Sequence, residues 1–320
     1  MRPANAVIVL LVLLLAGAAA TFIRTDLEPA AVEARYAADP ASAFVDASGL
    51  RVHVRDEGTG PAVVLLHGTG ASLHAWDGWA EALQDSFRVV RFDLAGFGLT
   101  GPHPERDYRI GTYVDAAAAL LDALGVERFV LAGNSLGGHV AWRYALARPE
   151  EVRGLVLLDP SGYDPARGDS ADTAFGDTTP FVFRLARSPL LAPLVRHASP
   201  RFLVEESLRD VFADDSQVTP ALVDRYLALQ RRAGNRQAFI DRARTRSAYR
   251  FDSLRTLLTP TLILWGGQDT WIPPAYADAF AEVLPNDSLI VYPGLGHVPM
   301  EEAPARTAAD VKRWISMLPS

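Results

Sequence analysis

The hydrophobic positions along the chain form short runs that predict buried strands. Six runs are mainly apolar, which is typical of parallel strands covered on both faces: 62–66, 89–92, 128–131, 154–158, 261–265 and 289–292. Residues 50–54 instead alternate apolar with polar side chains, which favours an antiparallel strand at a sheet edge. Between the strands, apolar positions follow helical spacing, as at 113–124 and 311–318. Strands and helices therefore alternate, and this order predicts an α/β fold.

The alternation stops between residues 161 and 254. This stretch has no buried-strand pattern and consists of short amphipathic pieces separated by prolines. We interpret it as a helical cap inserted between two parts of an α/β core, 42–160 and 255–320. Several large apolar side chains of the cap suit either a pocket wall or helix packing: Phe181, Phe183, Leu190, Leu191, Leu194 and Phe202.

The amino terminus departs from this globular pattern. Residues 6–23 are uncharged and mainly apolar, a length at the lower limit for a membrane-spanning helix. We expect residues 1–23 to anchor the protein in the cell membrane with the domain facing the envelope, and residues 24–41 to form a polar tether. One alternative is a signal segment cleaved near Ala20, which would give a periplasmic or secreted protein, and another is a buried core helix.

Charge and composition exclude several kinds of partner. The 320 residues carry a net charge of −7 and a pI near 5.5, so nucleic acid and electrostatic attraction to anionic lipid are not expected. The absence of cysteine excludes disulfides, thiolate metal sites and a cysteine nucleophile. The seven histidines show no ligand-like spacing. We therefore expect neither a metal nor a cofactor.

A Gly-x-Ser-x-Gly turn, Gly133 to Gly137, joins the strand at 128–131 to a helix. Such a sharp strand-to-helix turn is typical of a nucleophile elbow, which lifts the serine hydroxyl clear of the sheet. Glycines are needed two positions before and after the serine because larger side chains would collide there. Ser135 is therefore the candidate nucleophile, and a glycine-rich connection without chemistry is the alternative.

A serine hydroxyl needs a base, and the base needs a carboxylate that orients it. Asp269 follows the strand at 261–265, and His297 follows the strand at 289–292, so both lie on loops at strand ends. We expect His297 to be the base and Asp269 the acid. Asp269 could instead only cap a helix, in which case Asp159 is the substitute acid.

The first strand of the apolar series ends in His67-Gly68-Thr69-Gly70, a suitable place for an oxyanion loop. We expect the backbone N–H groups of Thr69 and Leu136 to form the oxyanion hole. His67 is interpreted as a structural residue that hydrogen-bonds this loop.

Together these motifs resemble the α/β-hydrolase superfamily over residues 44–318. The resemblance rests on five segments in family order: His67–Gly70, Asp93–Gly98, Gly133–Gly138, Gly267–Asp269 and Gly296-His297. It implies an eight-stranded, mostly parallel sheet with helices on both faces and a cap inserted after the sixth strand. The chain looks most similar to bacterial members with an amino-terminal membrane segment.

The resemblance also separates possible reactions. Haloalkane dehalogenases and epoxide hydrolases of this superfamily place an aspartate where this chain has Ser135. The Gly133–Gly138 motif is similar to that of hydrolases that cleave carbon–carbon bonds, but those have tryptophan in place of Val298 and a Gly-Pro-Gly turn in the oxyanion loop. We therefore expect a carboxylic ester hydrolase of small lipophilic substrates. The alternatives are carbon–carbon hydrolysis of vinylogous diketones and a non-catalytic binding module.

Overall fold

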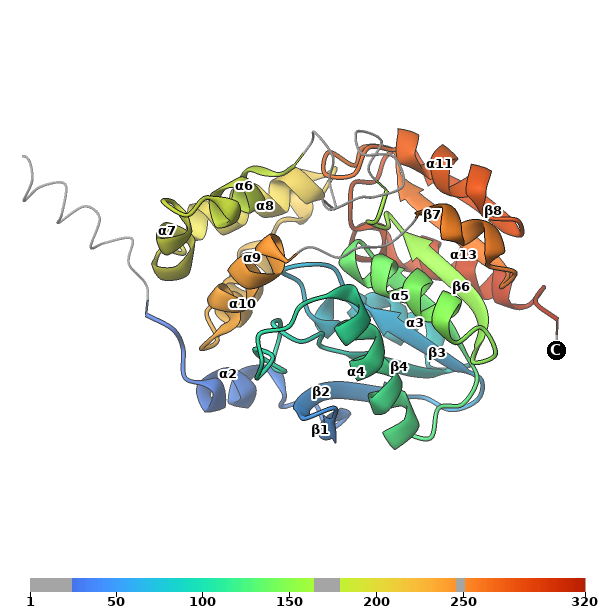
Figure 1. The fold of residues 1–320 in the computed structure, drawn as a ribbon, viewed down its shortest axis with the longest axis horizontal. Helices are drawn as coiled ribbons and strands as arrows, with labels where there is room; N and C mark the ends of the chain where they lie inside the picture. Colours follow the sequence, from blue (N-terminus) through green and yellow to red (C-terminus); the bar gives the residue numbers. More distant parts are fainter. Residues whose placement is uncertain (1–24, 164–178, 246–250, 320) are drawn as a thin grey trace, which may run out of the picture.

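A computed structural model describes residues 25–163, 179–245 and 251–319 (Figure 1). Its centre is one eight-stranded sheet in the order β1-β2-β4-β3-β5-β6-β7-β8. Strand β2 runs antiparallel to both of its neighbours, and all other pairs are parallel, so the expected sheet is confirmed. The strands are β1 (Ser42–Ala47), β2 (Leu50–Glu57), β3 (Ala62–Leu66), β4 (Arg88–Phe92), β5 (Phe129–Asn134), β6 (Val152–Leu158), β7 (Thr261–Gly266) and β8 (Asp287–Tyr292).

Helices cover both faces of the sheet because alternate side chains of each strand point to opposite faces. In β3, Val64 and Leu66 pack with α4 and α5, whereas Val63 and Leu65 pack on the other face with α3 and α13. The core helices are α3 (Asp77–Leu83), α4 (Ile110–Ala123), α5 (Leu136–Ala147), α11 (Ala275–Val283), α12 (Pro299–Glu302) and α13 (Pro304–Ile315), with 3-10 turns at Leu73–Trp76 and Phe251–Thr256.

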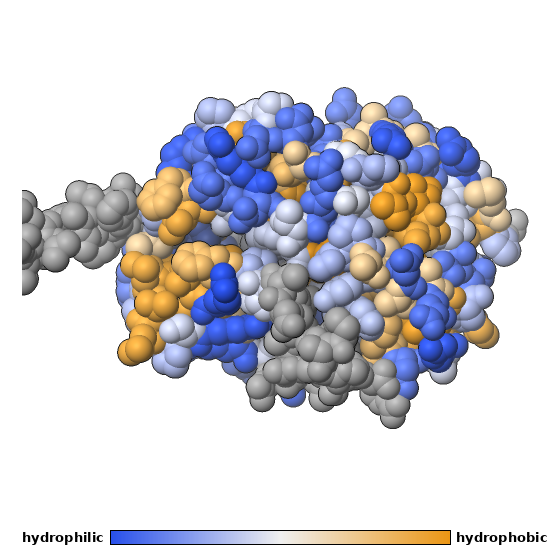
Figure 2. Space-filling view, turned by 90° about the horizontal axis from the view of Figure 1, so that it is seen from above, coloured by the Kyte–Doolittle hydropathy of each residue, from blue (hydrophilic) through white to orange (hydrophobic). Residues whose placement is uncertain are grey.

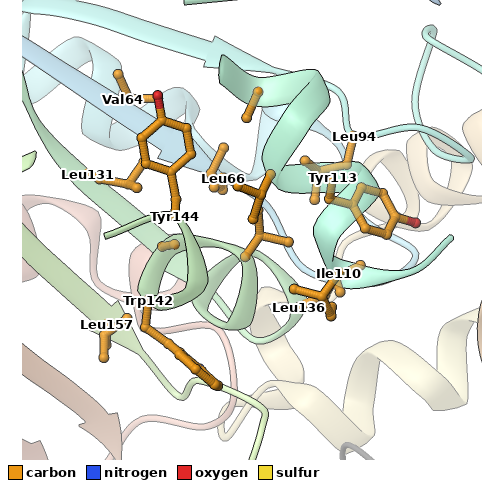
Figure 3. Close-up of a cluster of buried hydrophobic side chains, with 14 of the residues drawn as sticks. Val64, Leu66, Leu94, Ile110, Tyr113, Leu131, Leu136, Trp142, Tyr144 and Leu157 are labelled. Atoms are coloured by element: carbon orange, nitrogen blue, oxygen red, sulfur yellow. The ribbon is translucent and has the colours of Figure 1, made fainter. Parts of the chain in front are cut away.

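The first residue of α5 is fixed by this packing. The Leu136 side chain is buried and lies beside Ile110, in the same cluster as Leu66 and Leu131 (Figure 3). Further along α5, Trp142 and Tyr144 are also fully buried. The helix that follows Ser135 is therefore held by buried side chains around most of its circumference.

In its described residues the cap has five helices, inserted between β6 and β7, and Figure 1 shows them on the side of the sheet where β6 ends. They are α6 (Phe181–Arg187), α7 (Ala192–His197), α8 (Arg201–Val211), α9 (Pro220–Gln230) and α10 (Asn235–Arg244), with a 3-10 turn at Asp215–Gln217. The cap was expected over 161–254, and residues 164–178 and 246–250 of that range lie outside the described residues.

Most of the large apolar side chains suggested as pocket wall or helix packing lie at the surface of the part of the chain that the structure describes. Phe183 is buried, but five others are exposed: Phe181, Leu190, Leu191, Leu194 and Phe202. Figure 2 shows hydrophobic side chains gathered at the end of the molecule where α6 and α7 lie. Of these residues only Phe183 faces the interior of the molecule.

The segment expected to be a tether contains helix α2 (Pro29–Tyr36) and touches both parts of the molecule. Val32 is buried in a small cluster with Leu99 of the core and Leu229 of the cap. Before the helix, Asp26 pairs with the nearly buried Arg236 of α10 at 2.6 Å. Residues 25–36 therefore connect the core to the cap.

The expected membrane anchor needs correction. The longest helix among the described residues, α4, has 14 residues, whereas about 20 are needed to cross a bilayer. No helix in 25–163, 179–245 or 251–319 is both long and apolar enough to do so. Residues 6–23, from which we inferred the anchor, lie outside the described residues. The expected membrane anchor, and the envelope-facing location inferred from it, are therefore not supported.

Candidate active site

Ser135 lies between the end of β5 and the start of α5, in a backbone conformation that few non-glycine residues adopt. Its φ is +52°, and its N–H donates to the carbonyl of Leu158 at 3.0 Å. A Cβ atom at Gly133 would overlap the carbonyl of Gly137, and one at Gly137 would overlap the carbonyl of Leu66. Only glycine fits at these two positions, as expected for a nucleophile elbow.

Asp269 and His297 meet although they come from different loops. The turn after β7 carries Asp269, and the loop after β8 carries His297. His297 Nδ1 lies 2.7 Å from Asp269 Oδ2, and both side chains are buried. The other oxygen, Asp269 Oδ1, accepts hydrogen bonds from the N–H groups of Trp271 and Ile272. The carboxylate is therefore held from both sides, and it orients the imidazole.

The histidine loop is also tied to the elbow. Asn134, the residue before Ser135, donates from Nδ2 to the backbone carbonyl of His297 at 2.9 Å. His297 Nε2 is buried and has no hydrogen-bond partner among the described residues, Ser135 included. Such serine–histidine bonds are often long without substrate and tighten when it binds. The residue before Ser135 is thus bonded to the loop of His297, and Asp269 holds that imidazole with its Nε2 unengaged.

The expected oxyanion donors lie on two sides of the serine. Gly68 is so close to Ser135 that a Cβ on Gly68 would lie 3.2 Å from the serine Cβ, and Thr69 is the next residue. Leu136 begins α5, whose positive dipole end faces the same place. In the part of the chain that the structure describes, neither the Thr69 N–H nor the Leu136 N–H is engaged in a backbone hydrogen bond.

A sequence model of the alpha/beta hydrolase fold family matches residues 61–304, about three quarters of the chain. The chain belongs to the α/β-hydrolase family. A curated relative, the 2-hydroxymuconate semialdehyde hydrolase of Pseudomonas sp. (strain CF600), is 29% identical over 84% of this chain and 92% of its own length.

Two solved structures are similarly related to this α/β-hydrolase. A membrane phospholipase A, described as a bacterial virulence factor, is 29% identical with a TM-score of 0.72, over 99% of this chain and 98% of its own. A thermophilic esterase from Thermogutta terrifontis is 28% identical with a TM-score of 0.70, over 86% and 98%. Such relatives act on different substrates, so the family alone does not fix the reaction.

The loop expected to carry the Thr69 oxyanion donor is held by His67, whose hydrogen bonds are those expected of a structural residue. Its Nε2 accepts from the N–H of Leu94 at 2.9 Å, so its Nδ1 carries the proton and donates to the carbonyl of Gly68 at 2.8 Å. Burial lowers the pKa of the His67 imidazole, which keeps the ring neutral as both bonds require.

Asp93 is a second buried residue that holds backbone segments next to the His67 loop. Its carboxylate accepts from the N–H groups of Leu73 and Leu99 and lies 2.7 Å from His53 Nδ1. Gly98 is required beside it because any Cβ there would overlap the carboxylate. The sequence indicated Asp93 only as part of the Asp93–Gly98 segment, and its partner His53 carried no signal of its own.

Glu302 is a further residue that the sequence did not indicate. Its two oxygens accept from the N–H of Gly296, next to His297, at 2.7 Å and from that of Ala213, at the end of the cap helix α8, at 2.8 Å. The His297 N–H donates to the carbonyl of Val211 at 2.7 Å. The histidine loop is thus bonded directly to the cap.

The alternative acid, Asp159, is also in this group but does not contact the imidazole as Asp269 does. Asp159, Asp269 and His297 are, among the described residues, the one set whose polar atoms lie close enough to share a metal ion. The 2.7 Å separation of Asp269 Oδ2 and His297 Nδ1 is a hydrogen bond between them, so these atoms face each other. A hydrogen-bonded acid and imidazole therefore explain this set better than a metal site does.

Proposed function

We propose that this α/β-hydrolase is a serine hydrolase that cleaves carboxylic esters of small lipophilic acids or alcohols by acyl transfer. His297 Nε2 removes the Ser135 proton as the hydroxyl attacks the ester carbonyl, and the protonated imidazole then returns it to the leaving alcohol. Water, activated by the same nitrogen, releases the acid and regenerates Ser135. Asp269 stabilises the imidazolium in both steps.

The observation that carries this proposal is the buried 2.7 Å bond between His297 Nδ1 and Asp269 Oδ2, with Nε2 left unengaged next to the serine elbow. The bond from Nδ1 sets the tautomer in which Nε2 can accept a proton. The N–H groups of Thr69 and Leu136 are then available for the charge that develops on the carbonyl oxygen.

Aromatic side chains beside the imidazole support a lipophilic substrate. The ring of Trp271 lies 5.5 Å from that of His297, and Phe183 of the cap lies 5.9 Å from Trp271. An apolar wall at the reacting centre excludes water and favours apolar acyl or alcohol groups. The esterase and phospholipase relatives are consistent with ester cleavage by this fold.

The test is the loss of the nucleophile. Ser135→Ala should lower the turnover of a short p-nitrophenyl ester by a factor of roughly 10³ or more and abolish labelling by a fluorophosphonate probe. Ser86→Ala, at an exposed serine, is the matched control. Near-wild-type hydrolysis by Ser135→Ala would refute the nucleophile, and a folded wild-type protein that never labels would favour the binding module.

Carbon–carbon hydrolysis is the second candidate. It is favoured by the Gly133–Gly138 motif and by the similarity to the 2-hydroxymuconate semialdehyde hydrolase. A panel of esters, lactones and vinylogous diketones separates the reactions. Turnover of the diketones alone would replace ester cleavage with this reaction.

A further inference from the structure

Asp159 lies directly after β6 in a conformation that aspartate seldom adopts. Its φ is +44°, in the left-handed region. The Asp159 N–H donates to the carbonyl of Leu264 in β7 at 3.1 Å, which helps to hold this conformation. Backbone strain of this kind persists only where the surrounding structure enforces it, and it often marks functional sites.

The Asp159 side chain is fully buried and reaches the loop that carries the triad acid. Its Oδ1 accepts from the N–H of Gly266 at 2.8 Å, and the Gly266 carbonyl in turn accepts from the N–H of Asp269. Polar atoms of Asp159, Asp269 and His297 all lie within 4.8 Å of one another. The second oxygen, Asp159 Oδ2, receives no hydrogen bond from any donor in the described ranges.

The charges around Asp159 Oδ2 determine whether this oxygen carries a proton. Three titratable groups face Asp159: Asp269, His297 and, further away, Glu302. Burial raises the pKa of the Asp159 carboxyl well above its usual range, and the negative charge of the neighbouring Asp269 raises it further. Two ionised carboxylates this close in a buried site would repel each other strongly.

We propose that Asp159 is a positioning residue of the triad, a neutral acid that donates a hydrogen bond from Oδ2 to Asp269. Through Gly266 it also fixes the turn that presents Asp269 to His297. Asp159 and Asp269 together then carry a single negative charge, which balances the single positive charge of the His297 imidazolium. This inference rests on the proposed function, because Asp159 acts only through the other residues.

The kinetic test compares two variants. Asp159→Ala removes the donor and should lower kcat for a p-nitrophenyl ester by roughly tenfold or more with little change in KM, because Asp269 loses its orientation. Asp159→Asn keeps both contacts, since its amide oxygen accepts from Gly266 and its NH₂ donates to Asp269. It should restore most of the turnover that the alanine variant loses. Asp122→Asn, at an exposed aspartate, is the control.

A second measurement does not depend on activity. An unfolded chain ionises Asp159 near pH 4, whereas the folded protein keeps the proton to higher pH. The wild type should therefore lose stability relative to Asp159→Asn as pH rises from 4 to 8. The melting temperature of Asp159→Asn minus that of the wild type should therefore rise by roughly 3 °C for each pH unit, until Asp159 ionises in the folded state.

These outcomes decide between the two proposals. If the melting-temperature difference between Asp159→Asn and the wild type stays constant from pH 4 to 8, Asp159 is not a neutral acid. The same conclusion follows if the asparagine variant is as slow as the alanine variant. Wild-type kcat in Asp159→Ala overturns the positioning role. If the alanine variant does not fold, the pH dependence of the melting-temperature difference between Asp159→Asn and the wild type still tests whether Asp159 is neutral. If the wild type neither labels nor hydrolyses esters, the proposed function fails while the stability comparison still tests the charge of Asp159.

Discussion

At the scale of single residues, the two oxygens of Asp269 have different partners. Oδ1 accepts from two backbone N–H groups, of Trp271 and Ile272, and Oδ2 faces His297 Nδ1. All of these partners are donors, so only an acceptor at both positions satisfies them. An amide cannot do this, because one of its two ends is itself a donor.

We therefore expect Asp269→Asn to lower kcat by about 10⁴, through the wrong imidazole tautomer. Initial rates with a p-nitrophenyl ester measure this, with Asp122→Asn as the control for a changed surface charge. Turnover within tenfold of the wild type would show that another carboxylate orients His297.

Ser135, Asp269 and His297 could be predicted as a candidate triad from the sequence because each follows a recognisable strand, and their order along the chain fits one sheet edge. Their supporting contacts could not. Glu302 accepts from the N–H of Ala213, 89 residues away, and Asn134 donates to the backbone carbonyl of His297. Contacts with backbone atoms so distant in sequence leave no residue pattern that a reader of the chain can recognise.

At the scale of elements, the end of α8 and the loop after β8 share the Glu302 carboxylate. Burial raises the Glu302 pKa, but several backbone N–H groups, including those of Ala213 and Gly296, act against this. Removing the carboxylate leaves buried donors unpaired, at a cost of about 1–3 kcal/mol each.

Glu302→Ala should therefore slow fluorophosphonate labelling of Ser135 by roughly tenfold or more, because His297 loses its fixed position. Glu302→Gln retains one accepting oxygen and should recover part of the rate. The exposed Glu282→Ala serves as the control. Labelling of Glu302→Ala at the wild-type rate would mean that the histidine loop does not depend on this bond.

Most strands could be predicted as elements because their apolar runs are continuous. Strand β1 was not predicted from the residue pattern. Its residues Ser42–Ala47 have only one buried side chain. The structure places the turn at Ser48 and Gly49, which both have positive φ. An edge strand with little burial gives little periodic signal.

At the scale of the whole molecule, residues 25–36 join the two lobes that flank the triad. The buried Val32 is central to this contact, in a cluster with Leu99 and Leu229. We expect Val32→Asp to destabilise the protein by about 3 kcal/mol, because it buries an unpaired charge.

Thermal unfolding measures this change, and Val291→Asp, at an exposed position of β8, is the control. A melting temperature equal to that of the wild type would mean that the segment does not brace the two lobes.

The bonds between the end of α8 and the histidine loop also bear on how such enzymes diversify. The carbonyl of Val211 and the N–H of Ala213 belong to the cap, yet they hold the loop of His297, the proposed catalytic base. A chimera that received the cap of another hydrolase would inherit a new substrate chamber and, at the same time, a new support for its histidine. Recombination at the cap boundaries would therefore alter rate and specificity together, unless the donor cap supplied equivalents of the Val211 carbonyl and the Ala213 N–H.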